Sequence, residues 1–305
     1  MVSVVIPCYN QAHFLPHAID SVRTQGIADI DIIVVDDGST DDTADVARRL
    51  GVRVVSQRNQ GQGAARNHGL RHATGEYLVF LDSDDRLRPH ALELGLRHLT
   101  ERPECAFVAG RCLLFNEAGL IPEAKYHPLP ADDHYRRLLT WNFIMTPGCV
   151  VFRTAAVRNA GGFATDVTGA EDFDLYLRIA RQHPIFCHDD FVLEYRQHSG
   201  STSRRAALML RSTLKVVKRQ RRFAKGDPRL EGAWREGVRC FQQELGERTV
   251  LSIRRQLRNG TWPEIWPAAW ALARYYPEAL WQHPAKSLAR VLRGDHRDVL
   301  EEELP

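Results

Sequence analysis

Residues 77–89, YLVFLDSDDRLRP, join five consecutive apolar residues to a cluster of three aspartates. A continuous apolar run bounded by polar residues is typical of a strand buried on both faces of a parallel sheet. Asp82, Asp84 and Asp85 then follow its carboxyl end, where open α/β sheets bind ligands. Because crowded carboxylates repel one another, the cluster predicts a divalent-cation site, shared by Asp82 and Asp84 if the chain stays extended. A solvated acidic turn before a helix is an equally good interpretation of this stretch alone.

Strands and helices are expected to alternate upstream of this stretch. Short apolar runs predict strands, and apolar residues at helical spacing predict the helices between them. Such alternation indicates a mainly parallel sheet with right-handed crossovers and helices on its faces, an α/β fold. The expected strands are residues 2–8, 30–35, 52–55 and 77–81, and the expected helices are 14–25, 40–50 (with Thr40 as its cap) and 64–72.

The pattern becomes irregular after residue 99 and changes character near residue 204. Strands are expected at 106–115, 149–152 and 185–196, and helices at 136–141 and 172–181. Between residues 204 and 260 there are 16 Lys or Arg against 5 Asp or Glu, and helical spacing replaces strands. We therefore predict one domain over 1–203, with its ligand-binding part at about 1–100 and a second part at about 101–203, and a helical region over 204–305.

The overall composition narrows the class of protein. Hydrophobic residues make up 44% and charged residues 26%, which is typical of a soluble globular protein. The six cysteines show no CxxC spacing, so they indicate neither a cysteine zinc site nor a thioredoxin-like motif. With no visible secretory signal and no run of 18 apolar residues, we expect a cytoplasmic protein.

The ends of three predicted parallel strands are expected to meet in one crevice. Tyr9 follows the first strand, Asp37 the second, and Asp84 the fourth. Together these groups fit a nucleotide diphosphate: the ring stacks on the base, Asp37 accepts an N–H of the base, and Asp84 with Asp82 holds a bridging metal. Taken singly, Tyr9 is more simply a surface aromatic, whereas for Asp36 and Asp37 an ordinary turn before a helix is an equally good interpretation.

Three further polar stretches are candidates for the same site. Arg66 follows a loop with two glycines and sits early in a helix, where a cation suggests an anionic ligand or is simply solvated. Glu171 and Asp172 begin a predicted helix, where carboxylates suit the helix dipole but also suit a general base. His198 follows the last strand and is either a ligand contact or, more commonly, a structural histidine.

Taken together, these stretches resemble glycosyltransferase family 2, the inverting enzymes with the GT-A fold. The resemblance lies in VSVVIPCYNQAHFLPHAIDSV, IIVVDDGSTDDT, NQGQGAARNHGL, GEYLVFLDSDD, GAEDFDLYLRIA and YRQHSGSTSR, which span residues 2 to about 204. It implies a Rossmann-like, mixed and mainly parallel sheet flanked by helices, with residues 204–305 as a helical appendage outside the resemblance.

The resemblance also implies roles for individual residues. It places the catalytic base on Asp172, the second residue of the Glu-Asp pair. The expected nucleotide contacts are Pro7, Tyr9, Asn10, Asp37, Arg66, Asp82 and Ser83. The expected ligands of Mn²⁺ or Mg²⁺ are Asp82, Asp84 and His198, and the expected supporting residues are Asp36, Glu171 and Arg196.

The implied function is transfer of a sugar from a nucleotide-diphosphate donor, with UDP-sugars favoured, to an acceptor hydroxyl. Synthesis of cell-surface glycan or polysaccharide is the expected context. A nucleotidyltransferase making sugar nucleotides is an alternative, but the loop PCYNQAHFL lacks the glycine and lysine of its phosphate loop. A basic nucleic-acid-binding protein is a second alternative, based on the arginine-rich region. We expect no nucleic-acid partner.

The aromatic residues between 262 and 281 have two interpretations. Tryptophan and basic residues favour the membrane–water interface, so residues 204–305 would lie on the cytoplasmic membrane face, near a lipid-linked acceptor. Alternatively the tryptophans pack against the catalytic domain or a second copy of the chain in a homo-oligomer. The usual burial of tryptophan favours packing slightly.

Overall fold

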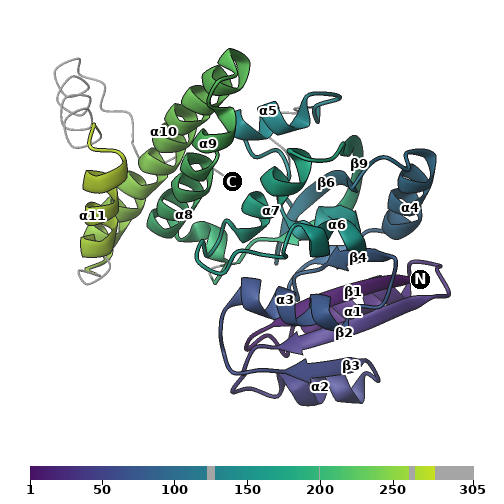
Figure 1. Ribbon diagram of the computed structural model, residues 1–305. Coiled ribbons are helices and arrows are strands. Elements are labelled where there is room, and N and C mark those ends of the chain that lie inside the picture. The colour runs from purple at the N-terminus through teal and green to yellow at the C-terminus, as the bar shows by residue number, and fades with distance from the viewer. Residues whose placement is uncertain (122–127, 199, 261–264, 279–305) are drawn as a thin grey trace. The chain divides into compact units, whose positions relative to one another are not determined.

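The computed structural model describes residues 1–121, 128–198, 200–260 and 265–278. The chain divides into two compact units, Met1–Ser199 and Gly200–Pro305, and each is described by itself (Figure 1). Trp262 and Trp281, two of the aromatic residues for which membrane contact or packing is expected, lie outside the described residues.

Four parallel strands form the first half of the sheet in unit 1, in the order β3-β2-β1-β4. They are β1 (Val2–Cys8), β2 (Ile30–Asp36), β3 (Arg53–Ser56) and β4 (Tyr77–Phe80), joined by α1 (Leu15–Arg23), α2 (Thr43–Arg49) and α3 (Gln62–His72). Right-handed crossovers in this strand order place α1 and α2 on one face and α3 on the other. Every residue of β1 is buried, because both faces of this central strand are covered.

The second half of the sheet is mixed. From β4 outward the strands are β8 (Val150–Arg153), β6 (Phe107–Asn116), β9 (Phe186–Arg196) and the short β5 (Arg86–Leu87), and β7 (Gly119–Leu120) pairs with β6. Among these strands only β6 and β9 run parallel to each other. The helices here are α4 (Ala91–Glu101), α5 (His134–Thr140), α6 (Thr154–Asn159) and α7 (Glu171–Ala180). The predicted mixed α/β sheet flanked by helices is confirmed.

Two helix starts differ from the sequence prediction for local reasons. Thr40 does not cap α2: its hydroxyl and its backbone N–H both donate to the Asn10 side-chain oxygen, at 3.2 and 2.7 Å, and the helix begins after Asp42. Helix α3 begins at Gln62, so Gly63 belongs to the helix rather than to the loop before it. A Cβ on Gly63 would lie 3.3 Å from the backbone oxygen of Ala164, so this glycine permits close packing. The elements β5, β7 and α6 are too short to show a sequence pattern.

The described part of unit 2 is helical, as expected of an appendage. Its helices are α8 (Ala206–Arg219), α9 (Arg221–Ala224), α10 (Pro228–Asn259) and α11 (Ile265–Tyr275). The long α10 begins with Asp227, whose side chain accepts hydrogen bonds from the Arg229 and Leu230 backbone N–H groups, and it ends at Gly260 with φ +72°. Helices α8, α10 and α11 pack against one another. None of the described helices is both long and apolar enough to cross a membrane.

Candidate active site

The acidic cluster after β4 forms a turn, not an extended segment. The Asp85 backbone N–H donates to the Asp82 backbone oxygen at 3.0 Å. The carboxylates of Asp82 and Asp84 therefore have different partners. Asp82 pairs with Arg66 at 2.7 Å, and Asp84 lies 2.9 Å from Nε2 of His198. The extended conformation required for one shared ligand is not present.

The last residue of β9, Arg196, is hydrogen-bonded to two neighbouring residues of this turn, Asp84 and Asp85. The Arg196 backbone N–H donates to Asp85 Oδ1 at 2.9 Å, and its Nε donates to the Asp84 backbone oxygen at 2.9 Å. The Arg196 guanidinium also stacks 4.7 Å from the Phe14 ring centroid. The predicted supporting residue Arg196 and the predicted ligand His198 are thus brought to the acidic turn, although they lie more than 100 residues away in sequence.

Asp85 is a residue whose importance sequence reasoning missed. It is fully buried, and its Oδ2 has no hydrogen-bond partner among the described residues. Burial and the charges of Asp84 and Asp82 raise the pKa of Asp85 well above its usual value. Burial and Asp82 likewise raise the pKa of Asp84, against the opposing effect of His198. The surroundings of the turn therefore stabilise the ionised forms of these carboxylates poorly.

Arg66 connects the acidic turn to the start of α7. The side chain is buried and lies 5.3 Å from the Phe163 ring centroid, so the interpretation as a solvated arginine is wrong. Burial opposes its charge, but Asp82, Glu171 and Asp172 together raise the pKa of Arg66. One buried cation is therefore shared among carboxylates from two different motifs.

Asp172 has the properties required of a general base. Burial, partly offset by the charge of Arg66, raises the pKa of Asp172 to about 7, and Glu171 contributes in the same direction. The Phe173 backbone N–H donates to Asp172 Oδ1 at 2.7 Å and orients the carboxylate. Asp172 remains partly exposed, whereas Glu171 is buried. The Asp172 carboxylate is thus surrounded by enough protein to be largely desolvated, yet part of it remains accessible from solvent.

Asp174, the third acidic residue of this helix start, is structural. It is buried and pairs with Arg178 at 2.7 Å, one helical turn later. Arg178 in turn donates to the Gly162 backbone oxygen at 2.6 Å. Through Arg178, Asp174 therefore holds the segment before α7 in place. Its carboxylate is engaged in this ion pair.

Asp37 organises the loop between β3 and α3. Its Oδ1 accepts hydrogen bonds from the Gln57 side chain at 2.8 Å and the Gln60 backbone N–H at 2.9 Å, and its Oδ2 accepts one from the Gly61 N–H at 2.8 Å. The neighbouring Asp36 accepts a bond from the Ser39 N–H at 2.9 Å. Both acidic residues thus shape local loops, which the sequence alone did not show.

The end of β1 presents one exposed and one structural side chain. Tyr9 is 47% exposed, as a ring that stacks on a ligand requires. Asn10 adopts φ +54°; its backbone N–H donates to Ser39 Oγ, and its side-chain oxygen accepts from the Thr40 N–H. Asn10 therefore links the β1 end to the loop after β2. Pro7 is buried within β1.

Two glutamines that sequence reasoning did not select complete this region. The Gln62 side chain donates to Asp82 Oδ1 at 2.9 Å. The buried Ser83 hydroxyl donates to the side-chain oxygen of Gln11, so the predicted contact between Ser83 and the nucleotide competes with an internal bond. Their positions in the NQGQG and CYNQA stretches, which carry the family resemblance, are the signal in the sequence that could have found them.

The predicted metal ligands Asp82, Asp84 and His198 are not gathered around one point. Among the residues that the structure describes, they are not a group of three ligand atoms close enough to share an ion. Their chemistry nevertheless fits a hard divalent cation, because two carboxylates and an imidazole stand where negative charge is incompletely neutralised. In the structure Asp82 Oδ1 contacts Arg66 and Gln62, and Asp84 Oδ2 contacts His198.

Comparison with protein families and known sequences gives consistent results. Residues 3–161 match the family model described as glycosyl transferase family 2. Chondroitin synthase of Escherichia coli is 34% identical over 214 residues, covering 67% of this chain and 30% of the relative. Hyaluronan synthase of Pasteurella multocida is 31% identical over 185 residues, covering 59% of this chain and 19% of the relative. The chain thus spans about a third or less of the length of these relatives.

Solved structures show the same fold. Mannosyltransferase PcManGT from Pyrobaculum calidifontis, in complex with GDP-Man and Mn²⁺, has a TM-score of 0.61 at 22% identity, covering 92% of this chain and 82% of the other. S. aureus TarS 1–349 in complex with UDP-GlcNAc has a TM-score of 0.57 at 19% identity, covering 91% and 92%. The family match covers more than half of the chain, and the predicted resemblance is confirmed: this chain belongs to glycosyl transferase family 2 and has the GT-A fold.

Proposed function

We propose that this protein transfers a sugar from a nucleotide-diphosphate donor to an acceptor hydroxyl, with inversion at the anomeric carbon. UDP-sugars are the favoured donors, and synthesis of a cell-surface polysaccharide or glycan is the proposed context. The observation that carries the proposal is the pKa of Asp172, raised to about 7 beside a buried Arg66 that is ion-paired to the acidic turn. Similarity to chondroitin and hyaluronan synthases supports a role in polysaccharide synthesis.

The donor nucleotide is proposed to bind across the ends of β1 and β2. Tyr9 is exposed and free to stack on the base. Asp37 Oδ2 accepts a hydrogen bond from Gly61, and a carboxylate oxygen has two lone-pair positions, so the second suits an N–H of uracil. Of the structural neighbours, TarS was solved with UDP-GlcNAc and PcManGT with GDP-Man, which supports a nucleotide-diphosphate sugar as the donor.

The acidic turn is proposed to hold Mn²⁺ or Mg²⁺ with the donor diphosphate. Asp84, Asp82 and His198 would be its ligands, and the ion would neutralise charge on the departing diphosphate. Arg66 and His198 would help to stabilise the same negative charge from the protein side. The raised pKa of Asp84 supports a cation here, because burial and Asp82 destabilise the charged carboxylate more than His198 stabilises it in the free protein.

Asp172 is proposed to accept the proton of the attacking acceptor hydroxyl. The acceptor oxygen then forms a bond to the anomeric carbon as the bond from that carbon to the diphosphate oxygen breaks. A base is most effective when its pKa lies near the working pH, since it is then ionised and still basic. Asp172 meets this condition through burial, while Glu171 and Arg66 adjust the pKa in opposite directions.

Unit 2 is proposed to contact the cytoplasmic face of a membrane. On α11, Trp266 is 77% exposed and Trp270 is 57% exposed, and their spacing of four residues places them on one helical face. Packing does account for other aromatic residues: Tyr276 is buried, and Trp234 Nε1 donates to the Val217 backbone oxygen at 2.9 Å. Exposed tryptophans next to a basic region are the combination that anionic membrane surfaces attract.

Donor binding and turnover test the proposed function. Calorimetry should show that UDP or GDP binds much more tightly with Mn²⁺ than without it, and a panel of UDP-sugars and GDP-mannose should identify a donor that is slowly hydrolysed. Asp84→Ala should remove the metal dependence, whereas Asp45→Ala, at an exposed position of α2, should leave it unchanged. Metal-independent nucleotide binding, or no nucleotide binding at all, would contradict the proposal.

A further inference from the structure

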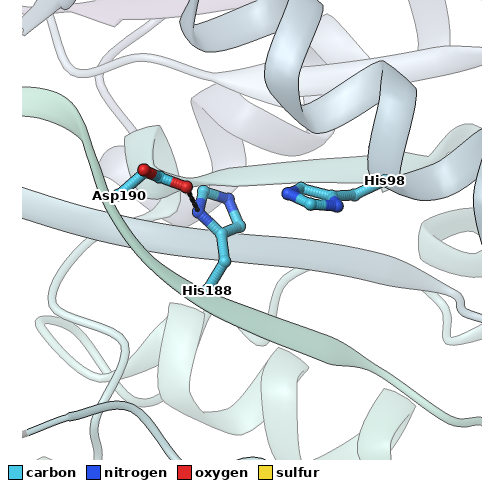
Figure 2. A group of neighbouring side chains, drawn as sticks. All are labelled: His98, His188 and Asp190. Atoms are coloured by element: carbon cyan, nitrogen blue, oxygen red, sulfur yellow. Dashed lines mark ion pairs between the residues drawn. The ribbon is translucent and has the colours of Figure 1, made fainter.

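Two histidines and an aspartate meet between α4 and the beginning of β9, away from the acidic turn. His98 comes from α4, and His188 and Asp190 come from β9; Figure 2 shows the two imidazoles facing each other. The ring centroids of His98 and His188 are 4.9 Å apart, and His188 Nδ1 lies 3.2 Å from Asp190 Oδ2. Each residue offers one potential ligand atom, and these three atoms lie within 4.8 Å of one another.

The backbone around this cluster is irregular. Along the β6–β9 pairing, Ala109 is opposite Cys187 while Arg111 is opposite Phe191, so β9 contains two extra residues here. The segment that bulges includes His188 and Asp190. Bulges redirect side chains and are over-represented next to functional sites. In this case the bulge presents His188 and Asp190 to the helix that carries His98.

Two ring nitrogens in the cluster are buried and unsatisfied. Neither His98 Nε2 nor His188 Nδ1 has a hydrogen-bond partner among the described residues, although His188 Nδ1 lies 3.2 Å from Asp190 Oδ2. The His188 side chain is only 8% exposed. Buried polar atoms in native proteins are normally paired, so two unpaired nitrogens at one point call for a ligand. Both atoms lie in the space between the same two elements.

The charge state of the histidines suits a metal. Burial and the neighbouring His98 lower the pKa of His188 to about 4, and burial with Arg102 lowers the pKa of His98. Both rings are therefore neutral at physiological pH, the form that binds metals.

The surroundings of His98 resemble a second coordination shell. Glu101 Oε2 lies 3.5 Å from His98 Nδ1, and metal-binding histidines commonly donate their second N–H to a carboxylate. Donation from Nδ1 to Glu101 would leave Nε2, which has no hydrogen-bond partner among the described residues, as the ligand atom. Arg102 Nη1 lies 3.3 Å from the same Nδ1 and can only donate to it, so metal binding at Nε2 requires the proton to be on Nδ1 and directed to Glu101.

We propose that His98, His188 and Asp190 bind a divalent transition-metal ion of the zinc class, at a site separate from the acidic turn. Zinc holds nitrogen and oxygen ligands tetrahedrally at about 2.0–2.2 Å, which places ligand atoms about 3.4 Å apart. The His188–Asp190 contact of 3.2 Å is already close to this value, and the remaining contraction, within the 4.8 Å spread of the three atoms, requires His98 and His188 to move toward each other. Imidazole ligands favour Zn²⁺, Co²⁺ and Ni²⁺, whereas the oxygen-rich turn favours Mn²⁺ or Mg²⁺. The ion would join α4 to β9 and keep a fourth position open to water.

The test uses the full chain with Zn²⁺ in the absence of nucleotide. Equilibrium dialysis should find one tightly bound Zn²⁺ per chain, and Co²⁺ should give the visible absorption of a tetrahedral site. His188→Gln and Asp190→Asn should each weaken this binding by 10²-fold or more, and Glu101→Gln by about 10–100-fold. Zn²⁺ at 100 times its Kd should raise the Tm of the wild type by about 5–10 °C, and the variants should lose this rise.

Two controls distinguish this site from adventitious binding and from the acidic turn. His90→Gln, at an exposed histidine paired with Glu93 at the start of α4, should bind Zn²⁺ like the wild type. Asp84→Ala should do the same. Zinc binding that survives both His188→Gln and Asp190→Asn, or that disappears in Asp84→Ala, would overturn the proposal, as would the absence of one bound equivalent at 100 µM Zn²⁺. Because Asp190 is exposed, its variant tests the site even if His188→Gln does not fold.

Discussion

Replacing Asp172 with asparagine should make the protein more stable while it removes activity. The folded-state pKa of Asp172 is about 7, against an ordinary value of 3.8. The native carboxyl thus holds a proton that the unfolded chain releases, so ionising it at pH 8 costs up to about 4 kcal/mol. Asparagine is never ionised and keeps the acceptor for the Phe173 N–H. If Asp172→Asn recovers half of this 4 kcal/mol, about 2 kcal/mol, the Tm should rise by about 4–8 °C.

The sign of this effect depends on pH, which makes the reasoning testable. The destabilising contribution of Asp172 is absent below about pH 4, grows between pH 4 and 7, and is complete above pH 7. Thermal unfolding of Asp172→Asn should therefore show a higher Tm than the wild type at pH 8 and no difference near pH 4. Sugar transfer should fall by about 10²–10⁴-fold, with UDP affinity unchanged.

A matched control lies two residues along the same helix. Asp174→Asn breaks the buried pair with Arg178, so its Tm should fall at pH 8, not rise. A Tm for Asp172→Asn that is unchanged or lower at pH 8 would refute the raised pKa. Transfer near the wild-type rate would refute the assignment of the base.

Three further outcomes are expected. The kcat/KM of the wild type should rise about tenfold from pH 6 to pH 8 as Asp172 ionises. Glu171→Gln should move this pH profile to lower pH, and an unmoved profile would show that Glu171 does not raise the pKa of the base. Asp84→Ala should abolish Mn²⁺-dependent UDP binding with little change in Tm. Asp85→Ala should chiefly lower the Tm, because the buried Asp85 accepts a hydrogen bond from the end of β9. The reverse result would make Asp85 the metal ligand and Asp84 the structural residue. Replacing both exposed tryptophans of α11 with alanine should prevent co-sedimentation with anionic vesicles, and a wild type that does not sediment at low salt would exclude membrane contact.

The sequence predicted those features that depend on local pattern. Continuous apolar runs located β1, β2 and β4 because strands buried on both faces require them. The family resemblance then selected residues that the fold brings near one another, such as Arg66 with Asp82 and Asp84 with His198. These partners are between 16 and 114 residues apart in sequence, so no pattern within one segment indicates the pairing.

Other features depend on packing and were not predictable. The turn at Asp82–Asp85 replaces an extended segment because Asp85 is drawn into the interior and accepts the Arg196 N–H. The cluster of His98 with His188 requires a bulge in β9, and a bulge depends on how β9 pairs with β6. Side-chain partners such as Gln11 for Ser83 likewise follow from the meeting of two loops rather than from either loop alone.

The three hydrogen bonds that Asp37 accepts from the loop before α3 have a consequence for the thermodynamics of donor binding. Fixing the backbone of one residue costs about 1–2 kcal/mol in conformational entropy. Because the loop is already held in the free protein, nucleotide binding does not have to order it. Calorimetry of UDP binding should therefore show a small entropic penalty in the wild type. The penalty should increase when Asp37→Ala releases the loop, even for a nucleotide whose base lacks the N–H that Asp37 is proposed to accept.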